Sequence, residues 1–391
     1  MLHGRKVCVL YLRTSPPIIF FSVSLIMPQV GVPTLKIGDL QICPPIIQGG
    51  MGIRVSIAGL AAAVANAGCV GIIASTGIGT FEDYQGDDLD KFNSEAMRAE
   101  IRKARTLTDG IIGVNIMVAL SDYEKLVKSA VEENVDMIIC GAGLPLDLPK
   151  FLDGKDIKLV PIVSSAKALK LICRRWQGRY DKLPDAVIVE GEKAGGHLGY
   201  SPESIADGSV PCLEDIVVDV VKYANSFDTP FPVIAAGGIF DGADIARFLA
   251  LGASGVQMAT RFVCTDECDA DHAFKQAYID AGPDDITIIK SPVGLPGRVI
   301  DNEFVKKIKA GQTMPFKCRY QCLRTCNPAK APFCIANVLA DAADGKLDSS
   351  FAFAGSNAYK CTEIIPVKTL VEKINTELLT ALNSGKVHTP A

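Results

Sequence analysis

One of the four histidines of the chain lies in a glycine-rich stretch, EGEKAGGHLGY, which spans residues 190–200. The stretch overlaps the end of AVIVE (186–190), an apolar run typical of a buried strand. Imidazole titrates near neutral pH, so His197 can accept a proton from a carbon atom. Gly195, Gly196 and Gly199 give the loop backbone freedom and leave room for a substrate. We therefore predict that His197 is a catalytic, proton-handling residue; a structural histidine satisfied by its neighbours is the alternative.

Two later apolar runs end in residues that suit a phosphate group. PVIAAGG ends at Gly237 and Gly238, and GVQMAT ends at Thr260. Glycine lets backbone N–H groups approach phosphate oxygens closely, and the threonine hydroxyl can donate a further hydrogen bond. These residues predict a phosphate site; a tight turn without a ligand is the alternative.

Three other apolar runs contain small or amide-bearing residues that suit a flat ring. QGGMG (48–52) combines glycines with the soft side chain of Met51, and CGAG (140–143) is small and open. Asn115 interrupts the apolar run GVNIM, and a buried amide needs both a donor and an acceptor, from a ring or from neighbouring backbone. One phosphate and one flat ring with polar edges fit FMN, with Glu190 orienting a ribityl hydroxyl or the ring. The predicted cofactor contacts are Gln48, Gly49, Gly50, Met51, Asn115, Ala142, Gly143, Glu190, Gly195, Gly196, Gly237, Gly238, Gln257, Met258, Ala259 and Thr260.

The elements that must position these residues are predicted by eight continuous apolar runs. They start near residues 45, 69, 111, 136, 159, 186, 232 and 255. Continuous rather than alternating runs are typical of parallel strands that are buried on both faces. Helical patterns lie between them, including SDYEKLVKSAVEEN (121–134), which opens with a Ser-x-x-Glu capping box, and DGADIARFLALGA (241–253), which opens with an aspartate cap.

This alternation predicts an α/β fold, a (β/α)8 TIM barrel over residues 35–280. A doubly wound sheet is the competing architecture. The count of eight favours the barrel. So do the glycine-rich and polar residues after nearly every strand, because in a barrel all strand ends converge on one site.

Both ends of the chain lie outside the predicted barrel. Residues 1–34 are predicted to be an extension, whose apolar run from Pro17 to Met27 is too short to span a bilayer as a helix. A signal peptide is one interpretation. A poorly structured extension ahead of a start codon at Met27 is the favoured one, because Pro16 and Pro17 interrupt the run. Residues 281–391 are predicted to be a cap and closing segment.

The predicted cap carries a cysteine cluster. Cys318, Cys322 and Cys326 are spaced four apart, and Cys334 follows. Four thiolates can bind zinc or an iron–sulfur cluster, although this spacing is not a common zinc-ribbon or ferredoxin pattern. A metal site is therefore one hypothesis, and packed or redox-labile thiols are the other.

The composition narrows the class of partner. The net charge is -4 and there is no lysine- or arginine-rich tract, which argues against nucleic acid. The 13 cysteines are scattered, as expected of reduced thiols in a cytoplasmic protein. We expect a small-molecule substrate and no membrane partner, and leave a homodimer open.

Five motifs in combination resemble the nitronate monooxygenase family, formerly the 2-nitropropane dioxygenases, and the related FMN-dependent enoyl-acyl-carrier-protein reductases. The motifs are QGGMG (48–52), GVNIM (113–117), EGEKAGGHLG (190–199), PVIAAGGI (232–239) and GASGVQMATRF (252–262). The resemblance covers the chain from about Pro45 to Phe262. It implies a (β/α)8 barrel that binds FMN non-covalently, with the phosphate near Gly237, Gly238 and Thr260 and with His197 handling the proton.

The resemblance implies two activities at one pocket. A nitronate monooxygenase oxidises an alkyl nitronate with FMN and O₂ to a carbonyl compound and nitrite. A reductase uses NAD(P)H to reduce FMN, which then reduces an enoyl thioester. QGGMG is nearer to the reductase style, and Ala259 replaces a usual glycine, so the substrate stays open. A flavin-binding protein without turnover is the third hypothesis.

Overall fold

The computed structural model describes residues 31–79, 88–318 and 321–384. Most of the predicted N-terminal extension lies outside these residues. Eight parallel strands form one sheet, in the order β3-β11-β10-β8-β7-β6-β5-β4. Their bounds are β3 Ile46–Gln48, β4 Gly71–Ala74, β5 Ile112–Met117, β6 Met137–Gly141, β7 Lys158–Val163, β8 Val187–Glu190, β10 Val233–Ala236 and β11 Gly255–Met258. A parallel bridge between Ile47 and Val70 joins β3 to β4 and closes the barrel. The predicted TIM barrel is confirmed.

Apolar side chains fill the inside of the barrel. Ile47, Ile72, Ile139, Ile188 and Ile234 belong to one fully buried cluster. The hairpin of β1 (Leu35–Ile37) and β2 (Leu40–Ile42) adds its own apolar side chains to that cluster. Since each such side chain contributes about 1.5–3 kcal/mol on burial, the interior is a packed core, and the ligand space must lie at one end.

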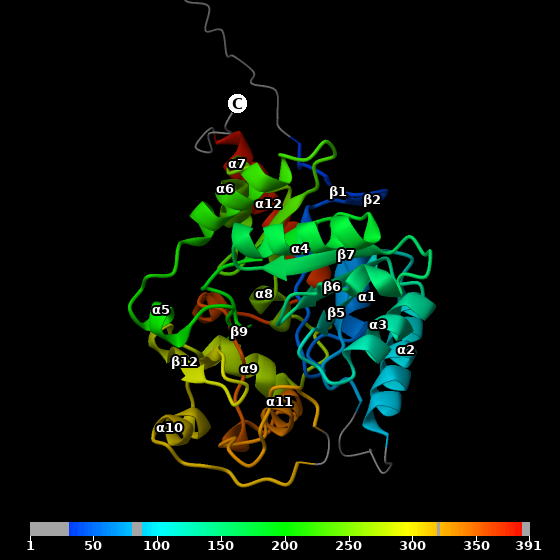
Figure 1. Ribbon diagram of the computed structural model, residues 1–391. Coiled ribbons are helices and arrows are strands. Elements are labelled where there is room, and N and C mark those ends of the chain that lie inside the picture. The colour runs from blue at the N-terminus through cyan, green and yellow to red at the C-terminus, as the bar shows by residue number, and fades with distance from the viewer. Residues whose placement is uncertain (1–30, 80–87, 319–320, 385–391) are drawn as a thin grey trace, which may run out of the picture.

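The helices cover the outside of the barrel (Figure 1). They are α1 (Ala58–Asn66), α2 (Leu89–Leu107), α3 (Tyr123–Glu132), α4 (Ala166–Tyr180), α6 (Leu213–Ala224) and α7 (Gly242–Ala250). Between β6 and β7 there is only a short 3₁₀ turn, η1 (Leu148–Phe151). The last helix, α12 (Val367–Asn383), packs against α7 and α1 and so fills the remaining place in the ring. The closing segment is therefore part of the barrel wall.

The two predicted helix starts differ in outcome. Asp241 caps α7 as predicted, with its carboxylate accepting from the backbone N–H of Asp244 at 2.9 Å. The predicted capping box at Ser121 is wrong, because α3 begins at Tyr123 after Asp122 and has no side-chain cap. The Ser121 hydroxyl instead donates to the carbonyl of Gln321. Ser121 thus links the barrel to the cap segment by a hydrogen bond.

The cap lies over the carboxyl ends of the strands, seen as the yellow and orange part of Figure 1. It contains β12 (Ile286–Lys290), β13 (Pro296–Ile300), α9 (His272–Asp280), α10 (Glu303–Lys309) and α11 (Ile335–Ala343). Strand β13 pairs with β9 (Gly196–His197), which belongs to the loop after β8. The cap is thus joined directly to the histidine loop. In the described part of the chain, no helix combines the length and the apolar character needed to cross a membrane.

Candidate active site

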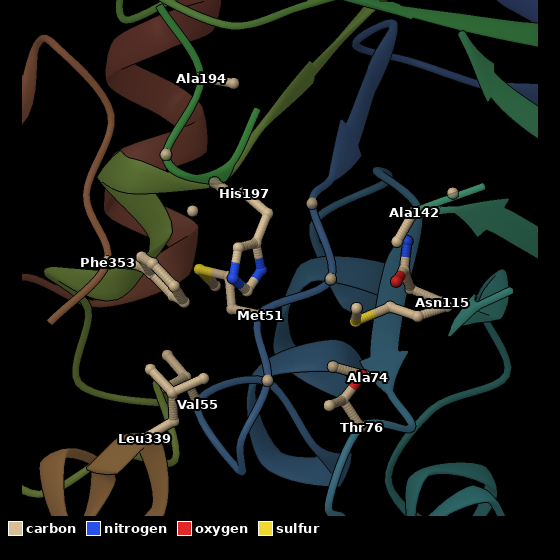
Figure 2. A pocket seen from close by; sticks show the side chains of 18 of the residues that line it. Met51, Val55, Ala74, Thr76, Asn115, Ala142, Ala194, His197, Leu339 and Phe353 are labelled. Atoms are coloured by element: carbon tan, nitrogen blue, oxygen red, sulfur yellow. The ribbon is translucent and has the colours of Figure 1, made fainter. Parts of the chain in front are cut away.

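A cavity of about 290 Å³ lies at the carboxyl ends of the barrel strands, beneath the cap. Figure 2 shows side chains from both parts around it. The wall includes nearly all of the predicted site residues: Gly49, Gly50, Met51, Asn115, Ala142, Glu190, Gly195, Gly196, His197, Gly237, Gly238, Gln257, Met258, Ala259 and Thr260. Strand ends that are far apart in the sequence therefore meet at one site, as the barrel topology requires.

Two predicted contacts do not line the cavity. Gln48 is fully buried, and its amide oxygen accepts from the backbone N–H of Ile72 at 2.9 Å while its amide nitrogen donates to the carbonyl of Gly49. Its polar atoms are used within the protein, so we assign it a structural role between β3 and β4. Gly143 is also absent from the wall and packs toward Val118, with φ +130°. Its conformation sets the turn that brings Ala142 to the cavity.

His197 is held from two sides. Its Nε2 lies 2.6 Å from the hydroxyl of Ser291, and its ring meets the edge of Phe353 at 5.0 Å between centroids. The imidazole points into the cavity beside Met51 (Figure 2). Burial lowers the pKa of His197 to about 4, so the ring is neutral at physiological pH. Nδ1 has no hydrogen-bond partner among the residues that the structure describes, so this atom is available to a ligand.

Arg298 holds the loop that carries His197. Its guanidinium donates to the carbonyls of Ala194 at 3.1 Å and Glu192 at 2.6 Å, and it lies 3.5 Å from the Glu192 carboxylate. Burial lowers the pKa of Arg298, and the nearby Glu192 opposes that shift. Glu192 therefore forms an internal pair, and the loop is fixed before any ligand arrives.

The predicted phosphate end is covered by the chain after Phe353. Gly237 and Gly238 adopt φ +99° and +77°, which few other residues tolerate. Asn357 donates to the carbonyl of Gly238 at 2.7 Å, and the backbone N–H of Gly355 donates to the hydroxyl of Thr260 at 3.2 Å. The Gly237-Gly238 turn and the Thr260 hydroxyl thus lie together, as predicted. The segment that covers them, Gly355 to Asn357, was not indicated by the sequence patterns.

Two more groups gather at the phosphate end. The Lys193 side chain lies directly beside Gly238. It is the one cationic side chain among the described residues of the cavity wall. The backbone N–H of Ser356 donates to the carbonyl of Lys193. The buried hydroxyl of Ser356 has no hydrogen-bond partner among the described residues, and it lies behind the cavity wall. Lys193, the hydroxyl of Thr260 and the glycine turn form a donor set in the cavity wall that suits a phosphate.

Two side-chain amides of the cavity wall lack partners in the described part of the protein. Among the described residues, the buried amide oxygen of Gln257 has no hydrogen-bond partner, and the side-chain amide of Asn115 forms no hydrogen bond. The close approach of Gly50 to the Asn115 side chain leaves no room for a Cβ. A flat ring with donors and acceptors on its edge would satisfy both amides. The residues present therefore fit a flavin, and they fit it better than a purely apolar ligand.

Glu190 adds a carboxyl group to the same wall. Its side chain forms no hydrogen bond within the described residues, and burial raises its pKa to about 7. Near neutral pH it can thus be either a donor or an acceptor to a ligand hydroxyl.

The raised pKa of Glu190 predicts that the free energy of unfolding of the flavin-free protein depends on pH. Since the pKa of Glu190 rises from 4.5 to about 7 on folding, the flavin-free protein loses stability as the pH rises through that window. We expect Glu190→Gln to exceed the wild type in free energy of unfolding by up to about 3 kcal/mol at pH 8, with the difference shrinking toward pH 5. Urea unfolding at both pH values measures it. Glu203→Gln, on an exposed carboxylate, is the control; a Glu190→Gln difference independent of pH would contradict the assignment.

The cap supplies wall residues that the sequence patterns missed. Leu323, Ile335, Leu339 and Phe353 make the side facing His197 apolar. At the barrel side, Asn93 donates to the carboxylate of Asp122 at 3.0 Å, and burial raises the pKa of that carboxyl. No short motif announces these residues, because their place depends on how the cap folds over the barrel.

The cysteine cluster does not form a metal site in this structure. Among the described residues, which include all four cysteines, no group of three or more His, Cys, Asp or Glu side chains is placed to hold a metal ion. Cys322 instead lines the cavity, and burial raises its pKa to about 12. The hypothesis of packed thiols fits this structure, and the metal hypothesis does not.

Comparisons with known proteins agree with this geometry. A family model described as nitronate monooxygenase matches residues 34–377. FabK from Thermotoga maritima shares the fold with a TM-score of 0.69 and 31% identity, covering 87% of this chain and 94% of that one. A probable nitronate monooxygenase of Staphylococcus saprophyticus is 30% identical over 69% of this chain and 79% of its own length.

A further similar protein has a different printed activity. The (3aS,4S,5R,7aS)-5-hydroxy-7a-methyl-1-oxo-octahydro-1H-indene-4-carboxyl-CoA dehydrogenase of Mycobacterium tuberculosis is 32% identical over 68% of this chain. The match spans 66% of that relative's length, slightly less than two thirds. The chain is thus similar to proteins that are named for more than one activity.

Proposed function

This chain belongs to the nitronate monooxygenase family, and from that premise we propose that it is an FMN-dependent enzyme that oxidises alkyl nitronates with O₂ to carbonyl compounds and nitrite. The observation that carries the proposal is the neutral imidazole of His197, held by Ser291 at the edge of a cavity whose orphaned amides fit a flavin. Family members are flavin-dependent, and the cavity residues of this chain fit the same cofactor.

Each part of the cavity has a task in the proposal. Gly237, Gly238 and Thr260 would hold the phosphate, Asn115 and Gln257 the ring edge, and Glu190 a ribityl hydroxyl. Bound FMN would supply the electron acceptor for the substrate and pass the electrons to O₂. The task of His197 is to take the proton from the carbon of a neutral nitroalkane, or to stand beside the nitro group of the anion. Negative charge placed beside the buried ring would raise its pKa and strengthen it as a base.

The charge of the wall favours simple alkyl substrates. The one cationic side chain among the described wall residues, Lys193, lies at the phosphate end beside Gly238. The walls near His197 are apolar, with Leu323, Leu339 and Phe353. A nitronate that also carries a carboxylate would find no cation there, because in this proposal Lys193 is used by the phosphate. An alkyl chain would bury apolar surface instead.

An enoyl thioester reductase using NAD(P)H is the second candidate. It is favoured by the length of the apolar wall, which continues from Phe353 along α11 through Ile335, Ala336 and Leu339. A carboxyl-CoA dehydrogenase is among the similar proteins, and its name supports a thioester as the substrate of this candidate.

A steady-state assay under air separates the candidates. FMN-loaded protein is supplied with ethyl nitronate while O₂ consumption and nitrite are measured, and in parallel with crotonyl-CoA and NADPH while NADPH oxidation is measured. Nitrite release that matches nitronate consumption supports the proposal. Thioester-dependent NADPH oxidation without nitrite would replace it with the reductase, and turnover of neither substrate would leave a flavin-binding protein.

A further inference from the structure

One carboxyl group of the active-site cavity has no task in the proposed reaction. Asp122 lies just before α3, and its side chain is buried although it lines the cavity. Its Oδ2 accepts a hydrogen bond from the side-chain amide of Asn93 on α2 at 3.0 Å. The amide oxygen of Asn93 in turn accepts from the backbone N–H of Gly79 at 3.3 Å. The position of the carboxylate is therefore fixed by hydrogen bonds within the protein.

The cap meets the barrel immediately beside Asp122. Leu120, two residues earlier in the chain, pairs with Leu323 of the cap in an antiparallel bridge. Both leucines line the cavity together with Asp122. Leu323 also belongs to the apolar wall that faces His197. An alkyl chain that lies on this wall therefore leads from the imidazole toward the carboxylate of Asp122.

Asp122 is the charged wall residue that the cofactor does not use. Among the described residues of the cavity wall, three are of the types Asp, Glu, Lys or Arg, namely Lys193, Glu190 and Asp122. In the proposed function, Lys193 and Glu190 serve the phosphate and the ribityl chain. Asp122 is left for the substrate, and its carboxyl group forms no ion pair with the described residues. The described wall thus offers the substrate an anionic acceptor and no cation.

The charges around Asp122 come from α2, its N-cap and α3. Burial raises the pKa of Asp122, the hydrogen bond from Asn93 opposes this shift, Asp90 raises the pKa further and Lys125 lowers it. Lys125 lies 2.9 Å from the carboxylate of Asp90 and 4.0 Å from that of Asp88. Because the charge of Lys125 is already engaged by these two aspartates, a second anion brought to Asp122 would meet like-charge repulsion.

We propose that Asp122 determines which nitronates the enzyme accepts. Its carboxylate excludes a chain that ends in a second negative charge and accepts a hydrogen bond from a chain that ends in a hydroxyl. This inference rests on the proposed function and names its substrate class. An ionised carboxyl group has about four acceptor positions, and Asn93 occupies one of them. A substrate hydroxyl can use another, whereas a substrate carboxylate has no proton to donate and would lose its hydration without compensation.

Turnover of three nitronates by the FMN-loaded protein tests the role of Asp122. They are the nitronates of 3-nitropropan-1-ol, of 3-nitropropionate and, as the uncharged reference, of 1-nitrobutane. Nitrite release gives kcat/KM for each at pH 8, which keeps Asp122 ionised. We expect the wild type to use the hydroxyl compound about tenfold or more better than the carboxylate compound. Asp122→Asn keeps the size of the side chain and removes its charge, so it should bring this ratio close to one.

Glu124→Gln is the matched control, because Glu124 is an exposed carboxylate on α3 that does not line the cavity. It should leave the ratio as in the wild type. Equal or better use of the carboxylate compound by the wild type overturns the inference, and this result needs no variant to fold. A wild-type preference that Asp122→Asn leaves unchanged overturns it as well. Turnover of none of the three nitronates overturns the proposed function and this inference with it, so the two failures can be told apart.

Discussion

Replacing His197 by asparagine is expected to lower kcat with neutral nitroethane by about 100- to 10,000-fold, the usual range for losing a general base. The reason is that Nδ1 of a neutral imidazole, anchored through Nε2 at Ser291, is the proton acceptor in the apolar half of the cavity. Preformed ethyl nitronate has already lost this proton, so its turnover should fall much less. Nitrite release from the two substrates, compared at equal flavin content, measures the difference.

Two variants accompany this prediction. His272→Asn changes an exposed histidine on α9 and should leave both rates unchanged. Ser291→Ala removes the anchor of His197 but keeps the imidazole, so its loss with nitroethane should be smaller than that of His197→Asn. Equal losses with nitroethane and ethyl nitronate would mean that His197 positions the substrate and is not the base.

Replacing Asn115 by leucine is expected to weaken FMN binding by about 10- to 100-fold. Leucine has nearly the same size, but it removes the amide that has no partner among the described protein residues and that faces the cavity wall opposite His197 (Figure 2). A flavin ring that loses this partner would bury unsatisfied polar atoms on its edge. Fluorescence titration of flavin-free protein with FMN measures the dissociation constant.

The control for this change is Asn225→Leu, at the exposed end of α6, which should bind FMN as the wild type does. Thermal unfolding of the flavin-free variants shows whether the barrel is intact. An intact Asn115→Leu variant with unchanged FMN affinity would exclude the amide from the ring site.

Much of the fold could be predicted because local patterns determine it. The runs around Ile72, Ile139, Ile188 and Ile234 are continuous because both faces of each strand are buried, which is a property of the segment itself. The failed capping box at Ser121 shows the limit. Its hydroxyl is drawn to the carbonyl of Gln321, a partner 200 residues away that outweighs the local motif. Likewise, no pattern in α12 indicates that it packs between α7 and α1.

The residues of the candidate site also fall into a group that the sequence predicts and a group that it does not. Glycines and polar residues at strand ends were predictable, because topology alone brings Gly50, Asn115 and Gly237 to one end of the barrel. Gln48 shares that position in the sequence, but its side chain points into the wall and bonds to Ile72. Ser291 and Phe353 reach His197 only through the folding of the cap, a long-range arrangement with no local signature.

The most direct test of the central claim is the visible absorbance of the FMN-loaded protein, titrated with ethyl nitronate in the absence of oxygen. If the cavity holds FMN and delivers an alkyl nitronate to it, the flavin absorbance will be lost on adding nitronate and will return when air is admitted. A protein that takes up no FMN, or whose bound FMN keeps its absorbance through excess nitronate, would contradict the account.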